Sequence, residues 1–149
     1  MQVRVASSLL ATGGELKNTF CLTQDHYAFM SQHIGDMENL ETLEAYGRSV
    51  EHLCSLYHAQ PEAVVCDLHP GYMTTDWAAK YAQAHNIPLV RGQHHHAHIA
   101  GTMAEHELDG TQPVIGVCFD GTGFGTDGAI WGGEVLIADY DGFRRAAHL

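Results

Sequence analysis

The sequence has few basic residues: seven Lys and Arg stand against 18 Asp and Glu, which gives a formal net charge of −11. Binding to nucleic acid or to an anionic membrane surface depends on a basic patch that neutralises phosphate groups. A chain with so little positive charge has little to build such a patch from. We therefore expect neither nucleic acid nor a membrane among its partners.

Long apolar runs are absent as well. The opening residues, MQVRVASSLLATGG, form too short and too interrupted a run for the core of a signal peptide, and no segment approaches a membrane span. The four cysteines, Cys21, Cys54, Cys66 and Cys118, show no CxxC spacing. Cys66 and Cys118 lie inside apolar runs, where a free cysteine behaves as a small hydrophobic residue. We expect a cytoplasmic protein with reduced thiols, none of them catalytic.

The order of apolar patterns predicts a mixed α/β protein. Three β-like pieces at residues 3–11, 18–22 and 27–31 form a first meander, and apolar residues at helical spacing follow up to Pro61. Next come a buried strand at 63–68, a helix at 75–85, a strand at 88–92 and a helix from the histidine cluster to about 107. The rest reads as strand, glycine-rich turn, strand, tight turn and strand. Strands alternating with helices predict a mixed sheet with helices packed on it.

The run GQHHHAHIAG contains His94, His95, His96 and His98. If a helix starts near Gln93, His94 and His98 lie one turn apart on the same face, where two imidazoles can chelate one divalent ion. His95 and His96 point in other directions, so at most two of the four histidines share one ion. A carboxylate would complete a site for zinc or ferrous iron. The alternative is a polar helix start that binds no metal.

Two glycine-rich segments are candidate phosphate sites. In FDGTGFGTDGAIWGGE, Asp120 ends an apolar strand, and Gly121, Gly123 and Gly125 would let several backbone N–H groups approach a phosphate. In ATGGELKNTFCL, Gly13 and Gly14 make a turn beside Lys17, one of only two lysines. The alternatives are a plain glycine-rich hairpin and a solvated lysine. The strand end CDLHPGY, with Asp67 and His69, could also line a site or cap the next element.

Five segments carry a resemblance to a known family: GGELKNTFCL, SQHIGDMENLET, CDLHPGYMTTDWA, QHHHAHIA and FDGTGFGTDGAIWGGE. They occur in the order found in the Kae1-like carbamoyltransferase domain of the HypF family of hydrogenase-maturation proteins, which the chain resembles over nearly its whole length. The resemblance implies an actin-like, ribonuclease-H-like ATPase fold, with a mixed sheet and helices on both faces. On this basis residues 1–110 are expected to form the first subdomain, and residues 111–149 the opening β-meander of a truncated second subdomain.

The resemblance also implies a function. Family members resemble enzymes that make carbamoyl-adenylate from carbamoyl phosphate and ATP in another domain. The Kae1-like domain then passes the carbamoyl group to the C-terminal cysteine thiol of a partner, HypE, as the precursor of the cyanide ligands of [NiFe]-hydrogenase. The implied metal ligands, for zinc or iron, are His94, His98 and Asp120, and Lys17 and Asp120 are the implied catalytic residues. The nucleotide is expected to contact Gly13, Gly14, Lys17, Asn18, Gly121, Thr122, Gly123 and Gly125.

Two other functions stay open at this stage. One is O-carbamoyl transfer to the hydroxyl of a small molecule by a related enzyme with similar histidine motifs. The other is a non-catalytic metal-binding or assembly module. The family's other domains and most of its second lobe are missing from this sequence, so we expect a fragment that is inactive on its own.

Overall fold

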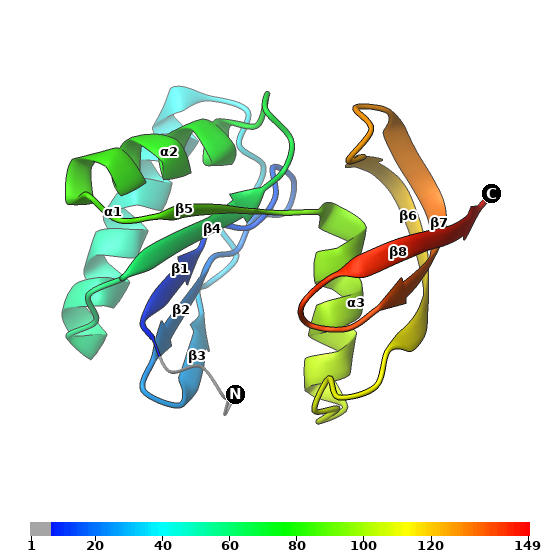
Figure 1. Cartoon of the computed structure of the whole chain (residues 1–149). Coiled ribbons are helices and arrows are strands. Elements are labelled where there is room, and N and C mark those ends of the chain that lie inside the picture. Colours follow the sequence, from blue (N-terminus) through cyan, green and yellow to red (C-terminus); the bar gives the residue numbers. More distant parts are fainter. Residues whose placement is uncertain (1–6) are drawn as a thin grey trace. The chain divides into compact units, whose positions relative to one another are not determined.

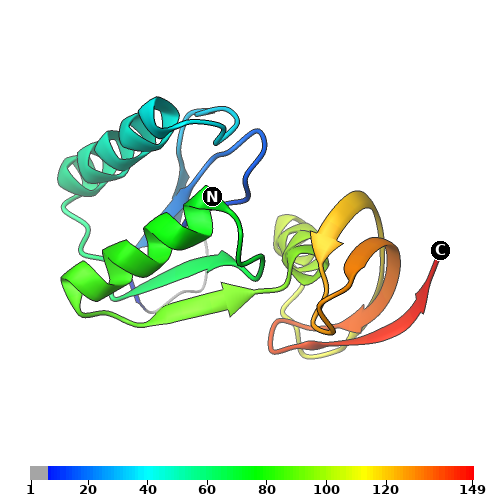
Figure 2. The ribbon, with the colours of Figure 1, turned by 90° about the horizontal axis from the view of Figure 1, so that it is seen from above.

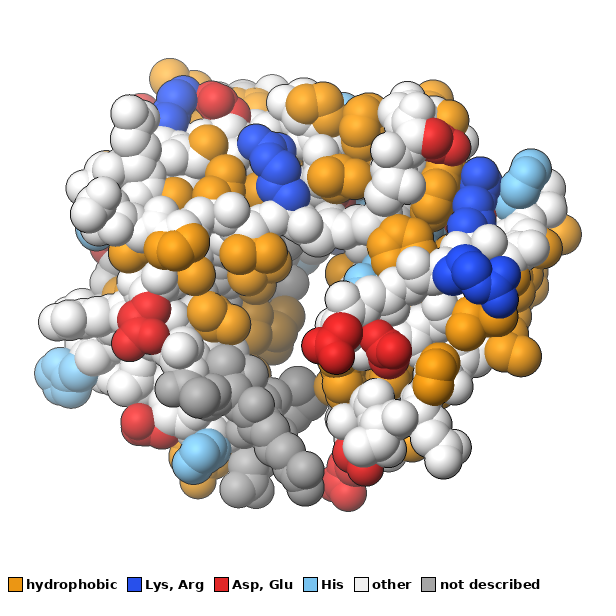
Figure 3. Space-filling view, viewed as in Figure 1, with side chains coloured by type: hydrophobic (Ala, Val, Ile, Leu, Met, Phe, Trp, Pro, Cys, Tyr) orange, Lys and Arg blue, Asp and Glu red, His pale blue; other side chains and the backbone are white. Residues whose placement is uncertain are grey.

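The computed structural model describes residues 7–149 and divides into two compact units, one reaching to Arg91 and the other running from Gly92 to Leu149 (Figure 1). The boundary predicted at residue 110 refers to the subdomains of the family. The division into compact units does not test it, so it stays a prediction. Among the described residues, no helix is both long enough and apolar enough to cross a membrane. On the face shown in Figure 3, the basic side chains are few and do not merge into a broad patch.

The first unit is built on a five-stranded mixed sheet with the order β3-β2-β1-β4-β5 (Figure 1). Strand β1 pairs antiparallel with β2 and parallel with β4, while β2 pairs antiparallel with β3. The strands are β1 Leu9–Ala11, β2 Cys21–Gln24, β3 Tyr27–Met30, β4 Ala63–Asp67 and β5 Leu89–Gly92. The part of the first predicted strand at residues 3–6 lies outside the described residues. The mixed α/β class predicted from the sequence is confirmed.

Two helices, α1 Leu40–Tyr57 and α2 Met73–His85, pack on the same face of this sheet (Figure 2). Leu10 of β1 packs with Tyr46 and Val50 of α1, while Val64, its cross-strand neighbour on β4, packs against α2. All four side chains have no exposed surface. The helices expected on the opposite face are therefore not among the described elements of this unit.

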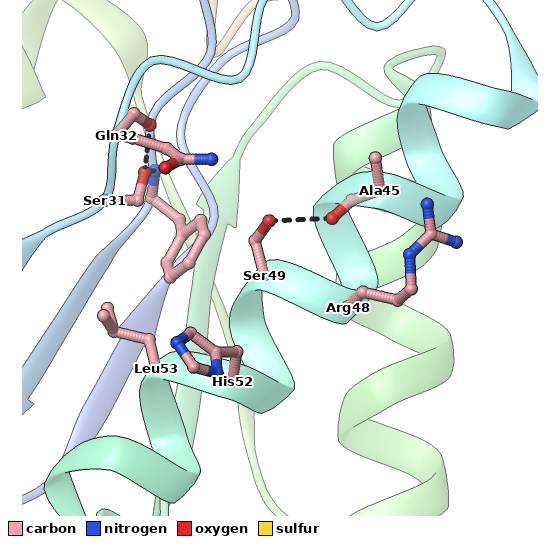
Figure 4. Close-up of a pocket in the computed structure, with 8 residues that line it drawn as sticks. Ser31, Gln32, Ala45, Arg48, Ser49, His52 and Leu53 are labelled. Carbon is pink, nitrogen blue, oxygen red and sulfur yellow. Dashed lines mark hydrogen bonds between the residues drawn. The ribbon is translucent and has the colours of Figure 1, made fainter.

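A shallow pocket lies between α1 and the loop after β3, with Phe20 and Leu53 beside the polar side chains of Ser31, Ser49 and His52 (Figure 4). The Ser49 hydroxyl donates to the Ala45 carbonyl at 2.8 Å, one turn back in the helix. None of the residues predicted to bind a metal or a nucleotide lines this pocket.

The second unit is an antiparallel sheet of order β6-β7-β8, with helix α3 on one face. Its elements are α3 His94–Glu105, β6 Val114–Phe124, β7 Ile130–Ala138 and β8 Phe143–His148. Ile99 and Met103 of α3 pack against Leu136 and Trp131 of β7. The opposite face is apolar and open, since Ile115, Val117 and Phe119 of β6 are 75, 53 and 82% exposed.

The structure corrects two details of the predicted elements. The sequence predicts a turn at the segment containing Gly121 and Gly123, but β6 continues through both glycines to Phe124, and the chain reverses only afterwards. Helix α2 begins at Met73, two residues before the predicted start at Thr75, because a distant side chain caps it.

That cap is Glu15, from the turn between β1 and β2. Its carboxylate accepts hydrogen bonds from the Met73 and Thr74 N–H groups at 3.0 and 3.4 Å, whereas the N-cap residue Tyr72 provides no side-chain cap. A carboxylate at a helix N-terminus satisfies free donors and favours the helix dipole. We expect Glu15→Ala to lower the free energy of unfolding by about 1 kcal/mol. Glu15→Gln, which keeps an acceptor, should lower the free energy of unfolding by less. Urea unfolding followed by circular dichroism measures both variants. Equal stability of all three proteins would contradict the capping role.

Candidate metal centre

Helix α3 carries the two histidines predicted to share one ion. Gln93 is its N-cap residue, and its side-chain oxygen accepts a hydrogen bond from the His96 N–H at 2.9 Å. With the helix starting there, His94 and His98 are one turn apart, and their Nε2 atoms lie 3.2 Å from each other. The i,i+4 spacing in the sequence therefore does bring the two rings together.

Asp120 reaches the same point from strand β6. Residues of a strand alternate between its two faces, and α3 covers the face of the even-numbered positions: a Cβ on Gly116 would lie 2.3 Å from the Ile99 side chain. Asp120 lies at the start of an irregularity in the pairing with β7, where the register passes from Phe119↔Gly133 to Gly123↔Trp131. Such bulges re-aim side chains.

The three side chains form a tight triangle of donor atoms. Asp120 Oδ2 is 2.7 Å from His94 Nε2 and 3.5 Å from His98 Nε2, which completes a triangle with the 3.2 Å separation of the two nitrogens. Donors bound to one ion at about 2.1 Å, with angles between octahedral and tetrahedral, stand about 3.0–3.4 Å apart. The observed separations of 2.7, 3.2 and 3.5 Å lie on both sides of this range, so small shifts of the side chains would bring all three onto one ion. Two imidazoles and one carboxylate suit zinc or ferrous iron and leave positions open for another ligand. The residues therefore fit a divalent transition metal.

The orientation of the Asp120 carboxylate agrees with this fit. Its Oδ1 accepts the Gly121 N–H at 2.7 Å, which fixes the carboxylate. Its Oδ2 is buried and has no hydrogen bond of acceptable geometry within residues 7–149, although His94 Nε2 is so close. A carboxylate oxygen in this state keeps its lone pairs for a cation.

The other two histidines of the cluster are used differently. The His96 Nε2 atom lies 2.7 Å from the Asp139 carbonyl oxygen, so its ring is turned away from the triangle. His95 is fully buried, in the same stripe of α3 as Ile99 and Met103. Burial, together with the neighbouring His94 ring, lowers the pKa of His95. The ring lies in the core of this unit, and its nitrogens do not belong to the group of donor atoms formed by His94, His98 and Asp120.

The predicted nucleotide residues of the second unit follow Asp120, three of them in β6 and Gly125 just after its end. Gly121 and Thr122 are exposed, whereas Gly123 and Gly125 are buried. A Cβ on Gly123 would lie 2.5 Å from His95 Cε1, and one on Gly125 would lie 2.2 Å from Trp131 Nε1. These two glycines are thus required for packing, whether or not a nucleotide binds beside them.

The first unit holds the other predicted turn. Gly13 has a positive φ of 72°, and a Cβ on it would lie 2.2 Å from the Thr19 carbonyl oxygen. The buried Asn18 amide donates to the carbonyl oxygens of Thr12 and Gly14 at 2.9 and 2.6 Å, so it holds the turn closed. The Lys17 backbone N–H donates to Asp36 Oδ1 at 2.6 Å. The residue is exposed, so solvent or a ligand can reach its ammonium group.

Burial has the same effect on all four cysteines. Burial raises the pKa of the Cys21, Cys54, Cys66 and Cys118 thiols. A raised pKa keeps a thiol protonated at neutral pH and makes it a poor nucleophile. Nothing in their environment therefore favours a catalytic cysteine.

Two features near the triangle were missed by sequence reasoning. Gln93 contacts both helix α3 and strand β6, because its side-chain nitrogen also donates to the Phe124 carbonyl at 3.3 Å. Glu134 of β7 is buried in a bidentate ion pair with Arg145 of β8. For Gln93, the only signal in the sequence was its position at the predicted helix start. The ion pair between Glu134 and Arg145 depends on the pairing register of two strands, which the sequence does not reveal.

Comparisons with known proteins give a consistent result. The family model described as the HypF Kae1-like domain matches residues 4–105, and the one described as the second subdomain of the carbamoyltransferase Kae1-like domain matches residues 116–149. Carbamoyltransferase HypF2 of Cupriavidus necator is 47% identical over 98% of this chain, which spans 18% of the relative's length.

Solved structures agree with the family models. A crystal structure of full-length HypF in a phosphate- and nucleotide-bound form is 47% identical, with a TM-score of 0.91 over 99% of this chain and 19% of that chain. The structure of HypF from T. kodakarensis is 37% identical, with a TM-score of 0.92 over 100% of this chain and 19% of its own. The matches thus cover almost all of this chain but only about a fifth of each longer relative.

Proposed function

Because the chain belongs to the HypF carbamoyltransferase family, we propose that it forms the metal-binding and part of the nucleotide-binding region of an enzyme that transfers a carbamoyl group to a protein thiol. The observation that carries this proposal is the triangle of His94, His98 and Asp120, whose donor atoms fit one divalent ion. The proposed donor is carbamoyl-adenylate, made from carbamoyl phosphate and ATP by another domain. The proposed acceptor is the C-terminal cysteine of a HypE-like partner, in the route to the cyanide ligands of [NiFe]-hydrogenase.

The proposed transfer is an acyl substitution. The partner's thiolate sulfur attacks the carbamoyl carbon, a C–S bond forms, and the bond from that carbon to the adenylate phosphate oxygen breaks, so AMP leaves with the electron pair. A zinc or iron ion held by His94, His98 and Asp120 would supply Lewis acidity toward the carbonyl or the phosphate. Because the attacking sulfur belongs to the partner, the raised thiol pKa values of this chain are no obstacle.

Each of the two units is proposed to supply groups that bind phosphate oxygens. In this proposal the turn of Gly13, Gly14, Lys17 and Asn18 binds phosphate oxygens, as do Gly121, Thr122 and Gly123 of β6 and Gly125 just after it. The exposed ammonium of Lys17 stabilises charge that develops on the leaving phosphate, and the Asp120 carboxylate holds the ion in place. A solved HypF relative is described as phosphate- and nucleotide-bound, which supports nucleotide binding within the family.

A chimera tests the function despite the short chain. Residues 4–149 would replace the matching segment of Cupriavidus necator HypF2, and the assay would be carbamoylation of the acceptor's cysteine, read by intact-protein mass spectrometry. We expect the chimera to transfer the group and its Lys17→Ala form to be slower by about 10²-fold or more, as for the loss of one charge-stabilising group. A folded, metal-loaded chimera that transfers nothing would contradict the proposal.

A further inference from the structure

Gln93 joins the two elements that carry the metal ligands. Its Oε1 accepts the His96 N–H at 2.9 Å in the first turn of α3, and its Nε2 donates to the Phe124 carbonyl of β6 at 3.3 Å. The same Nε2 lies 3.0 Å from His95 Nδ1. The side chain is only 5% exposed, so water does not replace these bonds easily.

These contacts fix the chemical state of His95. Because Oε1 must accept from a backbone N–H, the orientation of the Gln93 amide is determined, and the group that meets His95 is an N–H donor. Nδ1 of His95 is therefore the acceptor, and the neutral ring carries its proton on Nε2, a buried atom with no hydrogen-bond partner among the described residues.

His95 also contacts β6 directly. Its Cε1 and Nδ1 occupy the space where a Cβ on Gly123 would lie, at 2.5 and 2.9 Å from that position. Gly123 and Phe124 follow Asp120 by three and four residues, and Gln93 and His95 flank His94. Gln93 and His95 thus connect the backbone next to His94, the proposed ligand on the helix, with the backbone that follows Asp120, the proposed ligand on the strand.

We propose that Gln93 and His95 are positioning residues for the metal centre: they hold the first turn of α3 against the end of β6, so that His94, His98 and Asp120 meet at the spacing of one ion. This inference rests on the metal site of the proposed function. The three ligands come from two elements. The apolar packing at Ile99 and Met103 lies farther along α3, and the His96 ring reaches the Asp139 carbonyl, which follows β7, so neither contact joins the first turn of α3 to the end of β6. Nonpolar packing tolerates shifts that a metal site does not.

Cobalt(II) titration of the 149-residue chain, followed by its visible absorption, tests the role. His95→Leu removes the acceptor, and Gln93→Glu keeps the cap oxygen while removing both donors. We expect each to weaken cobalt binding by about 10- to 100-fold and to change the shape of the absorption bands. His95→Asn, whose Oδ1 stands close to the position of Nδ1, should recover most of the affinity. Ile99→Ala, in the same buried stripe, is the control for lost packing.

The outcomes separate positioning from stability. If Ile99→Ala lowers the thermal midpoint of the metal-free chain as much as His95→Leu but leaves cobalt affinity unchanged, the positioning role stands. If both variants lose the same affinity, or if His95→Leu binds like the parent, it is overturned. A chain that binds no cobalt contradicts the metal site of the proposed function. The hydrogen bonds between Gln93 and His95 are then tested in the metal-free chain by nitrogen NMR. They require His95 to be protonated on Nε2, and protonation on Nδ1 would overturn them.

Discussion

Alanine in place of His94 or His98, or asparagine in place of Asp120, is expected to remove the bound metal. The proposed site has three protein ligands among residues 7–149, so each substitution takes away a third of the coordination that these residues provide. Loss of a residue that merely supports a ligand costs about 10- to 100-fold in affinity, so loss of a ligand itself should cost at least about 100-fold. Asp120→Asn is the sharpest of the three, because it changes charge and donor strength with almost no change in size.

The measurement is metal content by elemental analysis after reconstitution and gel filtration, together with cobalt affinity. The parent chain should hold close to one ion, and each of the three variants should hold almost none. His96→Ala is the matched control: it lies in the same cluster, but its ring bonds to the Asp139 carbonyl and not to the triangle. A parent without metal, or equal losses at His96 and His98, would show that the cluster is not a defined site.

The general architecture could be predicted because it depends on local patterns. Apolar residues at threes and fours predicted helix α1, and two of them, Tyr46 and Val50, are fully buried. The i,i+4 spacing of His94 and His98 likewise follows from helix geometry alone, so it needed only a correct helix start. Periodicity fixes which residues share a face whenever the element type is right.

Features that depend on distant pairing could not be predicted. The bulge after Phe119 lets β6 continue through glycines that by themselves indicate a turn, and only its register with β7 reveals it. Glu15 caps a helix that begins 58 residues later in the chain. Gln93 gains its significance from a carbonyl 31 residues away. Each of these contacts forms only in the folded chain, so no local pattern of residues in the sequence predicts it.

The largest expected loss of stability follows from Arg145→Ala. Glu134 is 1% exposed, and its two carboxylate oxygens accept from Arg145 Nε and Nη2 at 2.6 and 2.7 Å. The guanidinium also lies 4.3 Å from the centre of the Trp131 ring, which adds a cation–π contact. Removing the arginine leaves the Glu134 carboxylate without its counter-charge, so the free energy of unfolding should fall by clearly more than for a substitution at an exposed position.

Urea unfolding followed by tryptophan fluorescence measures this loss. Arg144→Ala is the matched control, since the neighbouring arginine is exposed on β8 and should change stability by no more than about 0.5 kcal/mol. Adding Glu134→Gln to Arg145→Ala should restore part of the stability, because the uncompensated charge is gone. If the two arginine variants were equally stable, the pair would contribute nothing to the fold.

The same pair gives stability a defined pH dependence. The hydrogen bonds from Arg145 are the main cause that lowers the pKa of Glu134 below its ordinary value of 4.5. A carboxyl group whose pKa is lower in the folded state stabilises the fold above its unfolded pKa, and this contribution is lost as pH falls through the folded pKa. Stability of the parent should therefore decline below about pH 4.5. The double variant that combines Arg145→Ala with Glu134→Gln should show a shallower decline, because the neutral amide that replaces the carboxylate has no proton to bind.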